Sequence, residues 1–167
     1  MIFKTNITNK LKPFINSLIK ECVDQRYKYN INLGNNYELI TKQKNKLYKY
    51  FINFCKKKLK KFTVINKELK CWCYLSDKTI SYAAWHDHIK TSTIVGVIYL
   101  KVPKENKGID FLFNNKTINK KIKKGDLLIF PNFLKHYPYP SLNDDLRISI
   151  NLELNCLEQS KDIFNVQ

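Results

Sequence analysis

The chain lacks any apolar run that approaches the length of a membrane span, and its first residues, Met1–Asn6, do not have the pattern of a signal peptide. We therefore expect a soluble, cytoplasmic protein. The five cysteines are odd in number, and 167 residues are too many for a small disulfide scaffold. We expect free thiols in a reducing compartment. Cys71 and Cys73 have no second cysteine pair with which to complete a zinc site, and we interpret them as strand packing.

Arginine is almost absent from a strongly basic chain. The formal net charge is +16, but only Arg26 and Arg147 of the 30 basic residues are arginines, and the other 28 are lysines. Nucleic-acid sites favour arginine, because its planar guanidinium makes paired and stacked contacts. Abundant lysine, asparagine and isoleucine together indicate a compositional bias. A non-enzymatic, basic nucleic-acid-binding module stays open as an alternative that the sequence does not favour.

Two hydrophobic periodicities divide the chain, whose length predicts one domain over residues 1–167. Apolar residues spaced three and four apart predict helices over 7–27 and 37–62. From Lys70 onward the period is two, which predicts short strands over 70–74, 79–88, 93–101, 108–113, 117–122, 126–130 and 146–154. We expect a mainly β fold of the barrel or jelly-roll kind in 67–156, supported by helices in 1–66 and followed by a tail in 157–167.

Histidine is also scarce, and its three positions form a pattern. His86 and His88 are two residues apart on the predicted strand over 79–88, so both side chains leave the same face. His136 follows a turn, strand and stop over 125–131. A single histidine is most often a surface residue or a satisfied core residue. The chain nevertheless has only three histidines, and two of them have this spacing. We therefore predict that all three share one metal site.

Arg147 is the second unusual residue. It stands in an otherwise apolar predicted strand and shares a strand face with Ser149. In a chain that otherwise uses lysine, an arginine at such a position indicates a need for its planar fork, as in paired hydrogen bonds to a carboxylate. The alternative is a surface arginine that pairs with Asp144 or Asp145.

Four separate blocks of the chain resemble the iron(II)- and 2-oxoglutarate-dependent oxygenases, and most of all their prolyl-hydroxylase-like group from bacteria and phages. The blocks are His86-Asp87-His88, then Val95-Gly96-Val97-Ile98-Tyr99-Leu100, then Gly125-Asp126-Leu127-Leu128-Ile129-Phe130-Pro131, and finally His136 with Arg147-Ile148-Ser149. The resemblance covers residues 71–154. It implies a double-stranded β-helix, a cupin-like jelly-roll barrel. It also implies that His86 and His136 bind iron(II), and that Arg147, Ser149 and Tyr99 bind the distal carboxylate of 2-oxoglutarate.

The first block departs from the family at one position. The broad family has a carboxylate two residues after the first histidine, where this chain has His88. Either three histidines hold the metal, which we favour, or a bulge turns Asp87 inward. Three neutral ligands leave more net positive charge on the metal, which can alter which metal ion the site prefers.

The resemblance implies a dioxygenase that uses O₂ and 2-oxoglutarate to hydroxylate a C–H bond, with release of succinate and CO₂. The first alternative is a three-histidine dioxygenase or isomerase of the same barrel type that does not use 2-oxoglutarate. Aromatic residues that flank the predicted ligands are candidates for the substrate mouth or for packing at the barrel rim: Tyr82, Trp85, Tyr137 and Tyr139. The sequence identifies neither the substrate, which can be a peptide, an amino acid, a nucleobase or a small metabolite, nor the oligomeric state.

Overall fold

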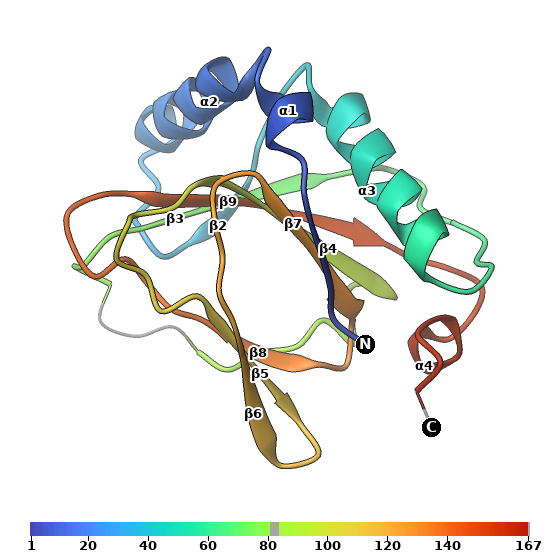
Figure 1. Cartoon of the computed structure of the whole chain (residues 1–167). Coiled ribbons are helices and arrows are strands. Elements are labelled where there is room, and N and C mark those ends of the chain that lie inside the picture. Colours follow the sequence, from blue (N-terminus) through green and yellow to red (C-terminus); the bar gives the residue numbers. More distant parts are fainter. Residues whose placement is uncertain (81–83, 167) are drawn as a thin grey trace.

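A computed structural model describes residues 1–80 and 84–166 of the chain. Two antiparallel sheets face each other, and helices cover the outer face of the larger one (Figure 1). The larger sheet has the order β1 (Phe3–Asn6), β7 (Asp126–Pro131), β4 (Ile94–Lys101), β9 (Arg147–Leu154), β3 (Cys71–Ser76) and β2 (Asn36–Glu38). The smaller sheet has the order β6 (Lys116–Lys120), β5 (Ile109–Phe113) and β8 (Lys135–Pro138). This arrangement confirms the predicted mainly β fold.

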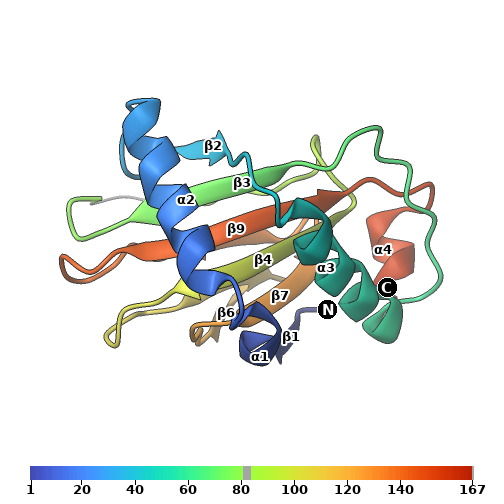
Figure 2. The same ribbon diagram turned by 90° about the horizontal axis from the view of Figure 1, so that it is seen from above.

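The helices α1 (Thr8–Leu11), α2 (Ile15–Lys28) and α3 (Lys44–Lys58) lie over the larger sheet (Figure 2). The side chains of β9 that face them are Ile148, Ile150, Leu152 and Leu154, and all four are buried in one apolar cluster with residues of α2 and α3. Gly96 of β4 allows the closest approach, because a Cβ at this position would lie 2.6 Å from Cε2 of Phe51 in α3. The apolar stripe of each helix is thus buried against the sheet, as expected.

The central strands bury both of their faces. Val95, Val97 and Tyr99 of β4 point away from the helices and pack between the two sheets with Phe111 and Phe130. Their neighbours Ile94 and Ile98 belong to the cluster under the helices. A strand that is buried on both sides has a nearly continuous apolar sequence, which is the pattern of β4.

The cysteines contribute to the core and form no disulfide. All five are free and buried, and Cys71 and Cys73 lie in β3, which confirms the interpretation as strand packing. A hydrogen bond with Cys73, together with burial, raises the pKa of the Cys22 thiol far above its ordinary value. No helix among residues 1–80 and 84–166 is long and apolar enough to cross a membrane.

Both predicted helices differ from the observed ones at their starts. The helix expected over 7–27 is interrupted between α1 and α2, because Pro13 has no amide hydrogen to continue the helical ladder. The helix expected over 37–62 begins only at Lys44. Tyr37 instead lies in β2, where its ring is buried and its hydroxyl donates to the Cys22 carbonyl oxygen. The expected tail over 157–167 contains the short helix α4 (Ser160–Ile163).

The strand predicted over 79–88 is absent from the described part of that range, residues 79–80 and 84–88. β3 ends at Ser76, and residues 84–88 form no strand apart from an isolated bridge between His86 and His136. Conversely, His136 lies in β8, a strand of four residues that the sequence did not indicate. Alternation over so few residues does not separate a strand from an extended loop that is held by a distant contact.

Candidate metal centre

The three histidines meet at one place between the two sheets. Their ligand atoms all lie within 4.8 Å of one another, in the one group of this kind among the described residues. Backbone hydrogen bonds hold the three histidines close together. The amide of His136 donates to the His86 carbonyl oxygen at 2.9 Å, and the amide of His86 donates back at 3.2 Å. The amide of His88 donates to the Asn132 carbonyl oxygen at 2.8 Å, which fixes the loop at its other end.

Each imidazole is oriented by a bond at Nδ1. That nitrogen lies 2.9 Å from the Ala84 carbonyl oxygen in His86 and 3.1 Å from the Leu134 carbonyl oxygen in His136. In His88 it lies 2.7 Å from Oε1 of Glu153. Carbonyl and carboxylate oxygens only accept hydrogen bonds, so Nδ1 carries a proton in all three rings. In a neutral ring this leaves the Nε2 lone pair free, and this is the tautomer that binds a metal.

The electrostatics at His86 and His136 favour neutral imidazoles. Burial lowers the pKa of His136 to about 3, and the neighbouring His86 acts in the same direction. Desolvation also lowers the pKa of His86. Rings that stay unprotonated near neutral pH keep their lone pairs available for a metal, because a metal and a proton compete for the same nitrogen.

Asp87 lies outside the histidine group. Its Oδ1 accepts a hydrogen bond of 3.3 Å from the Ile89 amide, so the carboxylate closes a local turn of the loop. His86 and His88 reach the same point although they are not on a regular strand, since the bridge to β8 holds the first and the Asn132 contact holds the second.

Arg147 lies deep in a cavity that His86 and His136 also line. The residue is only 2% exposed. Its Nη1 donates to the Tyr139 carbonyl oxygen, its Nη2 lies 3.4 Å from the Tyr99 hydroxyl, and its Nε has no hydrogen-bond partner among the described residues. No carboxylate of residues 1–80 and 84–166 forms an ion pair with it. Such a buried, unpaired cation destabilises the fold unless an anion joins it.

This environment differs from the surface ion pair that was the alternative for Arg147. Asp144 instead pairs with Lys78, with 3.0 Å between Nζ and Oδ2. Tyr99 and Ser149, the other two residues predicted to bind a carboxylate, line the same cavity as Arg147 and are both buried. Burial raises the pKa of the Tyr99 hydroxyl, so that it stays protonated and able to donate. The structure thus brings together five of the predicted site residues in one cavity: His86, His136, Arg147, Tyr99 and Ser149.

Trp85, Tyr137 and Tyr139 are not among the residues that line that cavity. The rings of Trp85 and Tyr137 are 5.7 Å apart between centroids, and Trp85 is 42% exposed. Tyr139 packs on Tyr137, and its hydroxyl donates to Asp110 at 2.7 Å. Tyr82 lies outside the described residues.

Sequence reasoning missed Glu153 and Asn151. Both follow Arg147 and Ser149 along β9 on the face away from the helices, Asn151 in the cavity and Glu153 against His88. Polar residues at every second position of a strand whose other positions are apolar were the signal that could have found them.

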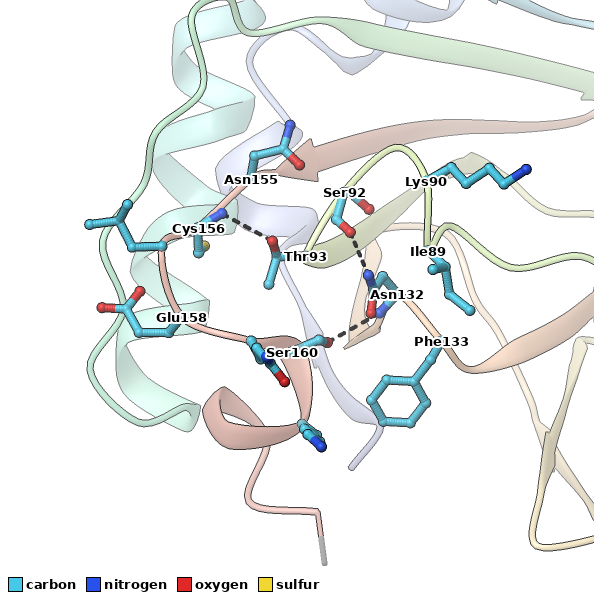
Figure 3. Close-up of a pocket in the computed structure, with 13 residues that line it drawn as sticks. Ile89, Lys90, Ser92, Thr93, Asn132, Phe133, Asn155, Cys156, Glu158 and Ser160 are labelled. Atoms are coloured by element: carbon cyan, nitrogen blue, oxygen red, sulfur yellow. Dashed lines mark hydrogen bonds between the residues drawn. The ribbon is translucent and has the colours of Figure 1, made fainter.

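A larger cavity of about 480 Å³ lies elsewhere, beside α4, and contains none of the three histidines (Figure 3). There Nδ2 of Asn132 donates to the Ser92 carbonyl oxygen at 2.6 Å, and the Asn132 amide lies 3.3 Å from Oγ of Ser160. These bonds fasten the start of α4 to the loops before β4 and after β7. The residues that line this cavity therefore connect α4 to the neighbouring loops.

Comparisons with known proteins support this fold. No family model matches the chain, and no curated protein matches it in sequence. Among solved structures, it is similar to a viral collagen prolyl hydroxylase from Paramecium bursaria Chlorella virus-1, with 14% identity, a TM-score of 0.63 and coverage of 94% of this chain and 90% of that one. It is equally similar to a Pseudomonas putida prolyl-4-hydroxylase, with 12% identity, a TM-score of 0.64 and coverage of 92% and 91%.

A third structure is a Trichoplax adhaerens prolyl hydroxylase in complex with a hypoxia inducible factor peptide fragment, with 12% identity, a TM-score of 0.64 and coverage of 92% and 83%. Identities this low show the fold alone. The chain has the double-stranded β-helix fold of the prolyl hydroxylases, which confirms the fold implied by the sequence resemblance.

Proposed function

We propose that the protein is an oxygenase that depends on iron(II) and 2-oxoglutarate. The observation that carries the proposal is that two of the three clustered histidines, His86 and His136, line one cavity with a buried arginine that has no carboxylate partner among the described residues. Three histidines alone would fit many metal sites, and a buried arginine alone would fit many anions. Side by side in this fold, the two match a metal chelated by a small dicarboxylate.

The residues fit the metal. His86, His88 and His136 would hold it through Nε2, since each Nδ1 is already bonded. Three protein ligands gathered on one side leave positions for a chelating 2-oxo acid and for O₂, as in non-haem iron(II) oxygenases. The bound iron, with 2-oxoglutarate and O₂, supplies the oxidation that hydroxylates a C–H bond and releases succinate and CO₂.

Arg147 would bind the distal carboxylate of 2-oxoglutarate. Its Nε hydrogen is unused, and its burial means that the carboxylate meets the guanidinium away from water, where a charged hydrogen bond is strong. The Tyr99 hydroxyl, 3.4 Å from Nη2, and the Ser149 hydroxyl would donate to the same carboxylate. The β strands that carry these groups fix their positions before the ligand arrives.

For the substrate, we propose a peptide side chain that rests on the Trp85 and Tyr137 rings. Two observations support it. Trp85 is 42% exposed and Tyr137 is half-buried, and each precedes or follows a histidine of the group in the sequence. The printed names of similar structures include a collagen prolyl hydroxylase and a hydroxylase bound to a peptide. We propose the same role for Tyr82.

The free cysteines agree with the proposed cytoplasmic location.

Calorimetry without oxygen tests the metal site, with manganese(II) as an inert substitute for iron(II). The wild type should bind about one metal ion per chain. His86→Ala and His136→Ala should each abolish tight binding, whereas Lys78→Ala, which alters only an exposed ion pair, should not. Unchanged metal content in both histidine variants would contradict the site.

Turnover separates the oxygenase from its alternatives. With iron(II), O₂ and 2-oxoglutarate, the wild type should form succinate slowly even without substrate. A three-histidine dioxygenase that does not use 2-oxoglutarate would form none. A nucleic-acid-binding module would need neither metal nor 2-oxoglutarate and would bind DNA or RNA in a salt-dependent manner.

A further inference from the structure

His88 differs from the other two histidines in what holds it. The backbone carbonyl oxygens of Ala84 and Leu134 accept from the rings of His86 and His136, but a carboxylate, that of Glu153, accepts from His88 at 2.7 Å. The hydroxyl of Thr91 also donates to this carboxylate oxygen, at 3.1 Å. The side chains of His88 and Glu153 are 14% and 17% exposed, so water screens their interaction only in part.

Glu153 is held firmly enough to position another group. It lies in β9, paired with Val95 of β4. Its amide donates to the Tyr48 hydroxyl at 3.3 Å, and Nδ2 of Asn66 donates to its carbonyl oxygen at 3.3 Å. Tyr48 is itself buried in α3. The main chain under the carboxylate is therefore fixed from the sheet and from the helix layer.

We propose that Glu153 is a positioning residue that gives the metal centre, through His88, the negative charge that three neutral ligands lack. This rests on the proposed function, because it takes His88 as a ligand. A carboxylate that accepts the Nδ1 hydrogen of a ligating imidazole fixes the ring and raises the electron density at Nε2. The resemblance leads us to expect a carboxylate two residues after His86, but this chain has His88 there. The carboxylate of Glu153 instead contacts Nδ1 of His88, on the side of the ring away from Nε2.

The proposal requires the charge as well as the hydrogen bond. Glu153→Gln keeps an oxygen that can accept from Nδ1 but removes the charge, and Glu153→Ala removes both. Carboxylates behind metal-bound histidines typically account for about 10–100-fold in metal affinity. We expect Glu153→Gln to weaken manganese(II) binding by about 10-fold and Glu153→Ala by about 100-fold. Glu68→Gln is the matched control, since its carboxylate pairs with Lys70 at 3.9 Å and touches no histidine.

A change of ligand provides the decisive comparison. In His88→Asp the aspartate should replace the imidazole as a metal ligand and would face a second carboxylate, that of Glu153. Glu153→Gln should now strengthen manganese(II) binding, because it removes the repulsion and its amide donates to the new aspartate. A purely structural role for Glu153 would give a loss in both backgrounds. Cobalt(II) absorption bands, which report the ligand field, should shift in Glu153→Gln relative to the wild type and stay unchanged in Glu68→Gln.

The outcomes are distinguishable. If the wild type binds manganese(II) and His86→Ala does not, but Glu153→Gln binds as the wild type does, the proposal for Glu153 fails and the metal site stands. A loss of affinity in both the wild-type and His88→Asp backgrounds overturns it as well. If the wild type binds no metal at all, both proposals fail together.

Discussion

The surroundings of Arg147 and His88 are the most informative about the chemistry of the candidate site. The guanidinium is buried in the sheet interior with Nε unpaired among the described residues, and the imidazole is held by a carboxylate. The unpaired guanidinium does not help a protein that needs only to fold, because a buried polar group without a partner destabilises it. The imidazole has a partner at Nδ1, and its Nε2 is the atom that a metal would use.

The choice between His88 and Asp87 as the third ligand is tested by two alanine variants. We expect His88→Ala to weaken manganese(II) binding far more than Asp87→Ala, because Asp87 bonds only its own loop. Calorimetry of both variants under identical conditions measures the difference. The opposite order would show that the loop turns Asp87 toward the metal, and two small, equal effects would show that two protein ligands suffice.

The depressed pKa of His136 predicts a pH dependence for the metal-free protein. The unfolded chain binds a proton to this histidine below about pH 6.5, whereas burial lowers the pKa in the folded state to about 3. Between these values the unfolded state holds more protons, so the free energy of unfolding falls as the pH drops from 6.5 toward 3. Urea unfolding at several pH values should show a shallower fall in His136→Gln than in the wild type. Equal slopes would show that His136 is not desolvated.

At the scale of elements, β9 connects the helix layer to the site. Its apolar positions pack under α2 and α3, and its alternate positions present Arg147, Ser149, Asn151 and Glu153 toward the cavity and the histidines. Period-two patterning identified this strand and the position of Arg147 from sequence. The loop of His86 and His88 could not be identified in the same way, because a backbone bridge to His136, far along the chain, determines its path.

The contact between α3 and β4 depends on the absence of a side chain at Gly96. A methyl group there would lie 2.6–2.9 Å from three ring atoms of Phe51, which is fully buried. Gly96→Ala should therefore lower the free energy of unfolding by about 1–3 kcal/mol, the usual cost of overpacking. Urea denaturation measures it. In Phe51→Leu the smaller side chain should reduce the cost of Gly96→Ala, and an unchanged cost would show that the ring is not what the methyl group meets.

For the whole molecule, the sequence was sufficient for the fold but not for every element. Alternation and apolar stripes predicted a barrel or jelly roll supported by helices, and the order of four motifs implied the double-stranded β-helix that the comparisons show. The strands β1, β2 and β8 were missed. Each has three or four residues and pairs with strands distant in sequence, so local patterning contains little information about it.

The net charge of +16 is also a property of the whole molecule. We expect it to cause weak, general binding to polyanions that has no link to the histidine site. Binding of a DNA duplex should fall steeply between about 50 and 200 mM salt. It should be the same in the wild type and in His86→Ala, with or without manganese(II). Salt-resistant binding, or binding that the metal alters, would instead support a nucleic-acid function.

The most direct test of the central claim is calorimetry of 2-oxoglutarate with the protein and manganese(II) in the absence of oxygen. The wild type should bind 2-oxoglutarate only when the metal is present. Arg147→Ala should weaken that binding by about 3–5 kcal/mol, the typical cost of removing one partner of a buried charge pair, and Arg147→Lys should weaken it less, since lysine keeps the charge and loses the planar fork. Metal affinity should stay unchanged in both. If the wild type shows no metal-dependent binding of 2-oxoglutarate at millimolar concentration, the assignment as a 2-oxoglutarate-dependent oxygenase is wrong.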